Sequence, residues 1–215
     1  MNNPYYPIML KLSNQRIVVI GGGSVAERKV HGLLDGGAKD IIVVAPTLCS
    51  QLQRLAQSKT INWIERSYER SLIEGATFVF AATDDKLLNE AISNDALACD
   101  ILVCNVSNGE QGSFITPAIA RHDGLTLAIS SGGSSPSLIK YMKNELLQHF
   151  LPRYEQARLL LERVRGDVLA SELNSKQRQY MLELATMEAV AGISDSYEQW
   201  FDKLYKRTVQ TEGEV

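Results

Sequence analysis

A run of small residues, Gly21-Gly22-Gly23-Ser24-Val25-Ala26, follows the first strongly apolar segment of the chain. Gly21, Gly23 and Ala26 have the spacing of the G-x-G-x-x-G/A pattern found in dinucleotide-binding βαβ units. In that pattern the first glycine permits a tight turn, the second lets the backbone approach a pyrophosphate, and the third small residue lets a helix pack closely on the sheet. A helix that begins here directs free backbone N–H groups and a partial positive charge toward phosphates. The run therefore predicts a nucleotide-binding site.

The segments on either side of the glycine run fit a strand and a helix. Ile17–Ile20 is short, apolar and β-branched, as expected of a parallel strand buried on both faces. After the run, one helical face is apolar and contains Ala26, Val30, Leu33 and Leu34. Gly36-Gly37 is a plausible end for this helix. A glycine-rich turn without a ligand is the alternative, and this strand–turn–helix context favours the nucleotide site over it.

Alternating strand and helix patterns continue to about residue 115, which predicts an α/β fold with a Rossmann-like parallel sheet. The further expected strands are residues 41–45, 61–64, 78–82 and 101–104. A crossover helix before the last strand is expected to bury one apolar face, consisting of Leu87, Leu88, Ala91, Ile92 and Ala96. Ligands of such sheets bind beyond the carboxyl ends of the strands. We therefore expect one crevice, surrounded by residues 21–25, 45–47, 82–85 and 105–108.

The residue that usually selects the nicotinamide cofactor is missing. Sites for NAD place an acidic residue about 20 positions after the glycines, where it holds the ribose 2′-hydroxyl. This chain has Ala45-Pro46-Thr47 there, with only a threonine hydroxyl and no arginine for the 2′-phosphate of NADP. At the end of a later strand, Thr83 follows small residues and Asp84 is a candidate ligand of cofactor or substrate, whereas Asp85 fits a helix start better. The residues alone leave the choice between NAD and NADP open.

The pattern changes twice after residue 115. Residues 116–150 contain an expected strand, Leu125–Ile129, and then a Ser/Gly run, Ser130–Pro136, whose Ser135 and Pro136 suit the N-cap and first residue of a helix. This run fits a helix-entry turn and an anion-binding nest equally well. Residues 151–215 have helical patterns alone, and we expect them to pack on the middle region or on another subunit rather than to form a large core. The predicted domains are therefore 1–115, 116–150 and 151–215.

Composition narrows the classes of protein. The chain has 215 residues, of which 45% are hydrophobic, and a formal net charge of −3, so neither nucleic-acid binding nor membrane-surface binding is indicated. No apolar run reaches the roughly 20 residues that span a bilayer, and no signal peptide is expected. Cys49, Cys99 and Cys104 form no C-x-x-C pair, and buried, reduced thiols of a cytoplasmic protein are the preferred interpretation. The three histidines are far apart, and no metal site is predicted.

Several motifs together resemble the siroheme synthase N-terminal family, whose members are precorrin-2 dehydrogenases and in some cases also sirohydrochlorin ferrochelatases. The motifs are GGGSVAERK at 21–29, VAP at 44–46, AATDD at 81–85, CNV at 104–106, SFITPA at 113–118 with Arg121, and AISSGGSSP at 128–136. They occur in order and at compatible spacing over residues 8–150, which makes the resemblance far more specific than the glycine run. The helical C-terminal region is similar only in length and character.

The resemblance implies NAD-dependent oxidation of precorrin-2 to sirohydrochlorin, a step toward siroheme or cobalamin, by a homodimer joined through the middle region. The matching positions give the expected cofactor-binding residues, which are Gly21, Gly23, Ser24, Val25, Pro46, Thr47, Thr83 and Asp84. Because precorrin-2 carries many carboxylates, the protein must concentrate cations locally. Arg121, Ser131 and Lys140 are the predicted substrate-binding residues, and a solvated helix face or turn is the alternative for them.

One position departs from the family. Many relatives have an aspartate after the fifth strand, implicated in dehydrogenation and metal insertion, where this chain has Asn108. An amide can neither accept a proton as a general base nor bind a cation as a carboxylate does, and Asn108-Gly109 also fits a plain tight turn. Asn108 and Asn105 are still the candidate catalytic residues, because hydride transfer depends largely on orienting cofactor and substrate. Two alternatives stay open: a bifunctional dehydrogenase and ferrochelatase, and a non-catalytic nucleotide sensor or tetrapyrrole-binding protein.

Overall fold

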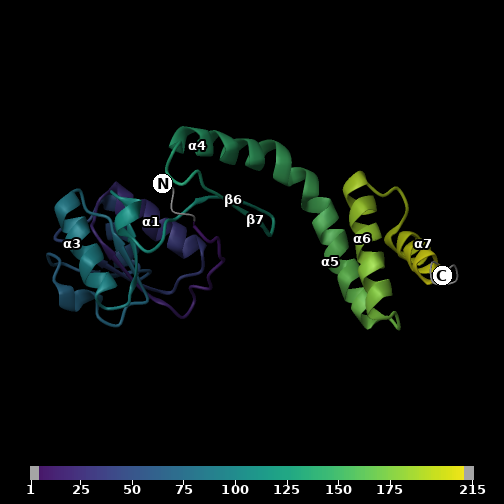
Figure 1. Cartoon of the computed structure of the whole chain (residues 1–215), viewed down its shortest axis with the longest axis horizontal. Helices are drawn as coiled ribbons and strands as arrows, with labels where there is room; N and C mark the ends of the chain where they lie inside the picture. The colour runs from purple at the N-terminus through teal and green to yellow at the C-terminus, as the bar shows by residue number, and fades with distance from the viewer. Residues whose placement is uncertain (1–4, 211–215) are drawn as a thin grey trace. The chain divides into compact units, whose positions relative to one another are not determined.

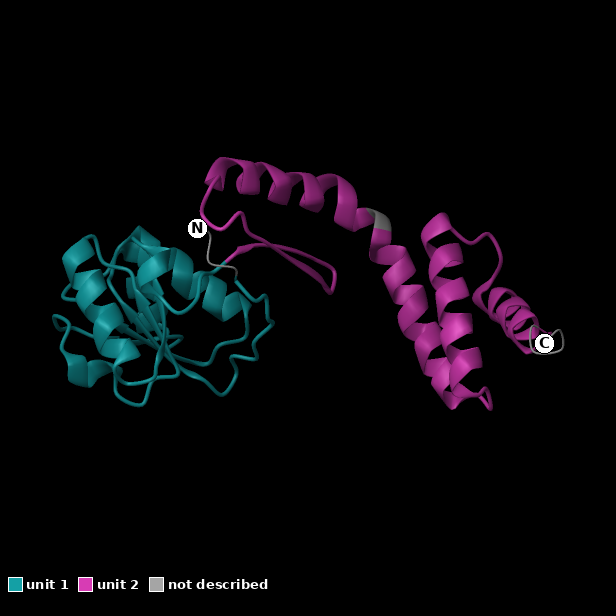
Figure 2. Ribbon diagram, viewed as in Figure 1, with its two compact units in different colours: residues 1–116 teal, residues 117–215 magenta. Residues whose placement is uncertain are grey.

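The computed structural model describes residues 5–210, and the chain forms two compact units, Met1–Thr116 and Pro117–Val215 (Figure 2). The first unit is an α/β domain, and the second consists of a β-hairpin and helices (Figure 1). The α/β class and the Rossmann-like sheet predicted from the sequence are confirmed. A further division of the second unit near residue 150 remains a prediction.

The first unit is built on a five-stranded parallel sheet with the order β3-β2-β1-β4-β5. Its strands are β1 Arg16–Ile20, β2 Asp40–Val44, β3 Asn62–Ile64, β4 Phe78–Ala81 and β5 Leu102–Asn105. In the register of the central strands, Val19 of β1 lies between Val43 of β2 and Phe80 of β4. The strand order reverses between β1 and β4, and in doubly wound folds such a switch point is where ligands bind.

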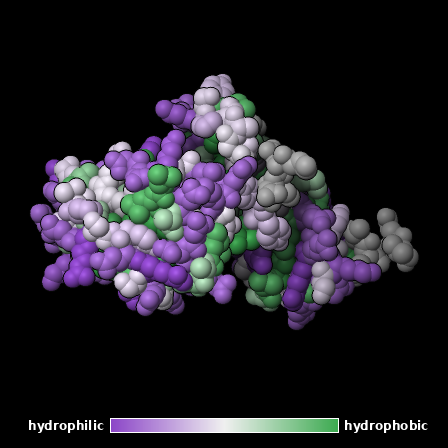
Figure 3. All heavy atoms as spheres, turned by 60° about the vertical axis from the view of Figure 1, so that its left-hand side comes forward, coloured by the Kyte–Doolittle hydropathy of each residue, from purple (hydrophilic) through white to green (hydrophobic). Residues whose placement is uncertain are grey.

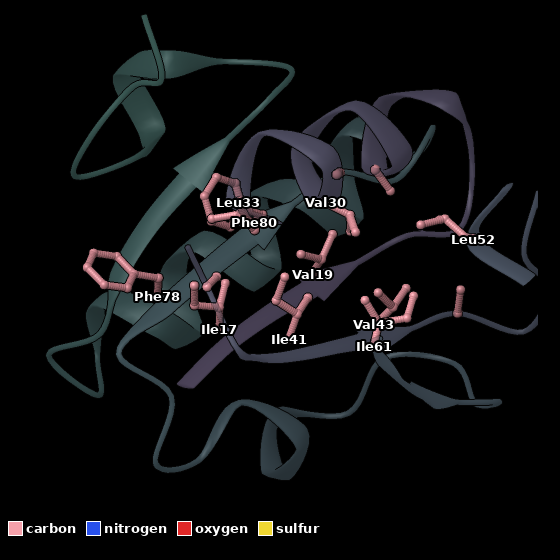
Figure 4. Close-up of a cluster of buried hydrophobic side chains, with 14 of the residues drawn as sticks. Ile17, Val19, Val30, Leu33, Ile41, Val43, Leu52, Ile61, Phe78 and Phe80 are labelled. Atoms are coloured by element: carbon pink, nitrogen blue, oxygen red, sulfur yellow. The ribbon is translucent and has the colours of Figure 1, made fainter. Parts of the chain in front are cut away.

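Helices cover both faces of this sheet, because successive side chains of a strand point to opposite sides. On one face, Ile17 and Val19 pack with Val30 and Leu33 of α1 and with Leu52 of α2 (Figure 4). On the other face, Val18 and Ile20 pack with residues of α3 and of the short 3-10 helix η1. The helical elements of this unit are α1 Ser24–Asp35, α2 Ser50–Gln57, η1 Arg70–Ile73, α3 Lys86–Leu97 and η2 Gly109–Gln111. Burial on both faces explains why the strands are continuous apolar runs.

The predicted ends of α1 and α3 agree with the structure. Gly36 is the C-cap residue of α1, and Gly37 has a φ of +81°, which glycine adopts without steric cost. Asp85 is the N-cap residue of α3, where its side chain accepts hydrogen bonds from the backbone N–H groups of Leu87 and Leu88.

The buried face of α3 differs from the expectation. Leu87 is 78% exposed and Ala91 is also exposed, whereas Asn89 and Ser93 are buried together with Ile92 and Ala96. The prediction assumed that apolar residues alone occupy the buried face. The buried face is therefore rotated about the helix axis so that it includes Asn89 and Ser93. Both side chains are buried because they have hydrogen-bond partners within the protein.

The second unit begins with an antiparallel hairpin of β6 Ala118–His122 and β7 Leu125–Ile129. β7 was predicted, but β6 was missed. The two strands are joined by Asp123 and Gly124, which both have positive φ angles, +42° and +81°. Asp-Gly with this geometry is a frequent two-residue hairpin turn.

Helical elements follow the hairpin to the end of the described chain. They are α4 Pro136–Glu145, the π-helical segment η3 Leu146–Phe150, the 3-10 segment η4 Leu151–Tyr154, α5 Glu155–Ala170, α6 Ser175–Ala191 and α7 Tyr197–Gln210. α4 begins as predicted, with Ser135 as N-cap residue and Pro136 at the first helical position, and it packs on β6 (Figure 1). None of the helices in the described residues is both long and apolar enough to cross a membrane.

The last three helices form a core of their own, contrary to the expectation from the sequence. Val164 and Val168 of α5, Met181 of α6, and Trp200 and Leu204 of α7 belong to one buried cluster. Small residues of α6, among them Ala185, are fully buried and let the neighbouring helices approach closely. The spacing of large apolar residues in the sequence did not predict this core of α5–α7, because several of its buried residues are alanines.

The cysteines are all free thiols. Cys104 is buried as expected, but Cys49 and Cys99 are only half-buried. Burial raises the pKa of the Cys104 thiol, which keeps this side chain neutral and poorly nucleophilic.

Candidate functional site

The glycine loop lies between the loops that follow β2 and β4. Gly21 has a φ of +127°, and a Cβ atom on it would lie 2.3 Å from the carbonyl oxygen of Ala82. A Cβ on Gly22 would lie 1.9 Å from the carbonyl oxygen of Thr47. A Cβ on Gly23 would meet nothing within 4 Å. The first two glycines are therefore required by the fold, whereas the third leaves open space at the surface of the loop.

The beginning of α1 faces this open space with unpaired donors. Gly23 is the N-cap residue, and its carbonyl accepts the first helical hydrogen bond from the N–H of Glu27 at 3.0 Å. In the described part of the chain, the N–H groups of Ser24, Val25 and Ala26 have no hydrogen-bond acceptor. A helix start of this kind binds phosphate oxygens. The free donors and the space over Gly23 fit the pyrophosphate of a dinucleotide.

The loop after β2 forms the second wall of the site. Pro46 and Thr47 are exposed, and hydrogen bonds on both sides fix the loop that contains them. On one side the indole Nε1 of Trp63 donates to the carbonyl of Ala45 at 3.0 Å. On the other side the N–H of Cys49 donates to the carbonyl of Gly22 at 2.8 Å. The two predicted cofactor residues of this loop thus lie beside the glycine loop.

The loop after β4 is held by a buried asparagine of α3. Asn89 is 0% exposed, and its Oδ1 accepts hydrogen bonds from the N–H and the hydroxyl of Thr83, at 3.0 and 2.8 Å. Its Nδ2 donates to the carbonyl of Thr83 at 3.0 Å and to the hydroxyl of Ser107, in the loop after β5, at 3.3 Å. Asn89 therefore joins the loop of Thr83 and Asp84 to the loop of Asn108.

Asn105 organises the loop after β5. It is 3% exposed, and its Oδ1 accepts hydrogen bonds from the N–H and hydroxyl of Ser107 and from the N–H of Asn108, at 3.0, 2.7 and 3.0 Å. Its Nδ2 donates to the hydroxyl of Ser93 at 3.1 Å and to Gln111 Oε1 at 3.3 Å. Both polar atoms of Asn105 are thus occupied within the protein.

Asn108 is exposed at the end of this loop. Its Oδ1 accepts a hydrogen bond from the N–H of Glu110 at 3.1 Å, and it is the N-cap residue of η2. The tight turn that Asn108-Gly109 suggested is therefore a single 3-10 turn. The Nδ2 of Asn108 has no partner among the described residues and can donate to a ligand.

The predicted substrate-binding residues all belong to the second unit. Arg121 on β6 and Lys140 on α4 are exposed, and neither has an ion pair in the part of the chain that is described. Ser131 accepts a hydrogen bond from the N–H of Ser135 at 3.1 Å, which stabilises the turn before α4. Gly132 and Gly133 in this turn have positive φ angles, +61° and +87°. The turn is thus stabilised internally, and the two cations are available to anionic groups.

Sequence reasoning missed Asn89 and Ser93, the two buried side chains of α3 that connect the loops. A helical pattern gives no signal for such residues, because polar residues in an amphipathic helix are normally assigned to its solvated face. Among residues 5–210, no group of three histidine, cysteine, aspartate or glutamate side chains is arranged to hold a metal ion.

Comparison with known proteins identifies the family of this chain. A family described as "Putative NAD(P)-binding" matches residues 8–118, a little over half of the chain. The chain belongs to this NAD(P)-binding family. This membership supports the nucleotide cofactor predicted from the glycine run.

Curated relatives of this family member are siroheme synthases. Siroheme synthase 3 of Aeromonas hydrophila subsp. hydrophila is 34% identical over 218 residues, which cover 98% of this chain and 46% of that protein. Siroheme synthase 1 of Aeromonas salmonicida is 37% identical over 150 residues, which cover 70% of this chain and 32% of that protein. The chain thus spans less than half the length of these two relatives.

A solved structure is similar over almost the whole chain. The structure titled "SirC, precorrin-2 dehydrogenase" has a TM-score of 0.78 and 25% sequence identity, and the match covers 94% of this chain and all of that one. Together with the siroheme synthases, it confirms the resemblance to the siroheme synthase N-terminal family.

Proposed function

We propose that this protein is an NAD-dependent precorrin-2 dehydrogenase, which oxidises precorrin-2 to sirohydrochlorin. The observation that carries the proposal is the similarity to the precorrin-2 dehydrogenase structure, because it extends over 94% of this chain and the whole of that protein. The siroheme synthases are much longer than this chain, so their complete activity is not transferred to it.

The cofactor site supports this proposal. Bound NAD supplies a hydride acceptor. The N–H groups of Ser24 and Val25 would hold its pyrophosphate, because they are free at the start of α1 and face the space over Gly23. Pro46, Thr47, Thr83 and Asp84 would line the rest of the crevice, as residues that follow the carboxyl ends of β2 and β4.

We assign different roles to the two asparagines. Asn105 is a positioning residue, since its polar atoms are used to hold Ser107 and Asn108. Asn108 orients the substrate through its free Nδ2. Oxidation removes a hydride and a proton from precorrin-2, and an amide cannot accept the proton. The proton would therefore pass to solvent water, which can reach the exposed Asn108.

The cations of the second unit suit an acidic substrate. Arg121 and Lys140 would bind carboxylates of precorrin-2 by charge-assisted hydrogen bonds, since both are exposed and have no competing ion pair in the described residues. The hydroxyl of Ser131 can still donate to a carboxylate while it accepts from Ser135.

We also propose that the protein is a homodimer joined through the second unit. α4 has no buried residue in the single chain, although Leu138, Tyr141 and Met142 share one side of it and are 51%, 64% and 41% exposed. Apolar side chains interrupt the polar surface of the molecule (Figure 3). A contiguous exposed apolar face is typical of an interface.

The free cysteines support the predicted cytoplasmic location.

The decisive experiment is anaerobic incubation of the purified protein with precorrin-2 and NAD. Formation of sirohydrochlorin and of NADH is measured by absorbance during the incubation. We expect both products to appear at equal rates and only when NAD is present. Binding of NAD without turnover of precorrin-2 would contradict the dehydrogenase and favour a nucleotide-sensing or tetrapyrrole-binding protein.

A further inference from the structure

The structure contains a carboxylate near the place where sequence analysis found none. The usual acidic residue after the second strand is replaced by Ala45-Pro46-Thr47. Glu27, in the first turn of α1, lies against the same loop, where its Oε2 accepts a hydrogen bond from the thiol of Cys49 at 3.2 Å. The carboxylate thus comes from the helix that begins at the glycine loop rather than from the strand.

The position of Glu27 is fixed from both sides. Cys49 is attached to the glycine loop, since its N–H donates to the carbonyl of Gly22 at 2.8 Å. Glu27 is attached to the same loop through the first helical hydrogen bond, from its N–H to the carbonyl of Gly23 at 3.0 Å. The carboxylate therefore lies where the glycine loop meets the loop after β2, two of the predicted walls of the dinucleotide site.

Glu27 forms no ion pair among the described residues, although Arg28 and Lys29 follow it in the chain. The side chain is half-buried, and its Oε1 has no partner among the described residues. The sequence from Ala45 to Gln53 contains no lysine or arginine. A negative charge without a neighbouring cation on this loop favours a neutral ribose hydroxyl and opposes a ribose phosphate.

We propose that Glu27 determines the preference of this protein for NAD over NADP. The inference rests on the proposed function, which places a dinucleotide at the glycine loop. The free Oε1 accepts a hydrogen bond from the 2′-hydroxyl of NAD, whereas the 2′-phosphate of NADP brings about two further negative charges toward the same carboxylate. Cys49 is a positioning residue, because its thiol holds the other oxygen of Glu27.

Glu27→Gln tests this role, because it removes the charge and keeps the shape. Dissociation constants of NAD and NADP are measured by titration calorimetry on the full chain without tetrapyrrole. We expect the wild-type protein to prefer NAD and the Glu27→Gln variant to reduce this preference about tenfold, chiefly through tighter binding of NADP, the size expected for one partly exposed charge pair. Glu90→Gln, which alters an exposed glutamate of α3, is the control and leaves the ratio unchanged.

Ionic strength provides a second readout. Salt screens the repulsion of the 2′-phosphate, so the preference of the wild-type protein falls as the salt concentration rises, and it falls less in Glu27→Gln. An unchanged NADP to NAD ratio in a Glu27→Gln variant that binds both nucleotides overturns the role of Glu27. Failure of the wild-type protein to bind either nucleotide has a different meaning, since it overturns the nucleotide site itself and the inference with it.

Discussion

The three adjacent glycines of the glycine loop differ in the substitutions that they tolerate, although the sequence shows three identical residues. Gly21 and Gly22 lie against backbone oxygens, whereas Gly23 faces open space. We therefore predict that Gly23→Asp leaves the fold intact and weakens NAD binding at least about tenfold, because a carboxylate is placed where the helix start would receive a pyrophosphate. Titration calorimetry gives the affinity, and thermal unfolding checks the fold.

Two alanine variants are the controls for Gly23→Asp. Gly23→Ala adds only a methyl group to open space and should retain the melting temperature of the wild-type protein. Gly22→Ala should lower it markedly, because the new Cβ would meet the carbonyl oxygen of Thr47. A folded Gly23→Asp variant with unchanged NAD affinity would show that this loop does not bind the pyrophosphate.

The amide at position 108 leads to a separate prediction about metal insertion into sirohydrochlorin. Since Asn108 is exposed and accepts a hydrogen bond through Oδ1, an aspartate can take its place without loss of the turn. We expect the wild-type protein not to accelerate insertion of Co²⁺ into sirohydrochlorin, and Asn108→Asp to do so, because a carboxylate can bind the cation and accept a pyrrole proton. The rate of change of the sirohydrochlorin spectrum is the measurement. Wild-type acceleration equal to that of Asn108→Asp would favour the bifunctional alternative.

At the scale of elements, α3 fixes the two loops that follow β4 and β5. Asn89→Ala removes the hydrogen bonds to the backbone N–H and carbonyl of Thr83 and the one to the Ser107 hydroxyl. We expect it to cost about 1–3 kcal/mol of unfolding free energy, since the half-buried backbone groups of Thr83 lose these partners. The NAD affinity should fall as well, because the loop of Thr83 lines the proposed crevice. Urea unfolding and calorimetry measure the two effects.

The neighbouring residue supplies the control for Asn89. Glu90 is exposed on the same helix, and Glu90→Ala should change the unfolding free energy by less than about 0.5 kcal/mol. If Asn89→Ala were as stable as this control, the loops would not depend on α3.

The elements also show what could be read from the sequence. Buried parallel strands such as β1 and β4 were predicted because both faces are covered, which makes them continuous apolar runs. β6 was missed because it is half-buried and ends in Arg121 and His122, yet the Asp123-Gly124 pair was a usable hairpin signal. The role of Asn89 could not be read from the pattern, since burial of a polar residue depends on partners from other elements.

The position of Glu27 illustrates the same limit in the candidate site. The motif located the glycine loop, because its chemistry depends on residues that are adjacent in sequence. The contact between Glu27 and Cys49 joins residues 22 positions apart and depends on how α1 and the loop after β2 pack. A search for an acidic residue confined to positions 45–47 therefore could not find a carboxylate that reaches this loop from α1.

At the scale of the whole molecule, the first unit has its own core and α5–α7 have theirs, but α4 has none. α4 packs on β6, but none of its residues is buried in the single chain, so its apolar side needs a further partner. A second copy of the chain satisfies this need symmetrically, since a two-fold interface brings the same surface of both copies together. The homodimer is therefore proposed on physical grounds as well as by resemblance.

This proposal predicts a wild-type protein with twice the chain mass of 23.8 kDa in sedimentation velocity experiments. The double variant Leu138→Glu/Tyr141→Glu should sediment as a monomer, because it places charges on the exposed side of α4 and removes no contact that is buried within one chain. Tyr180→Glu changes a 39% exposed tyrosine of α6 and should remain dimeric. A double variant that stays dimeric would exclude this side of α4 from the interface, and a monomeric wild-type protein would show that α4 folds without a second copy.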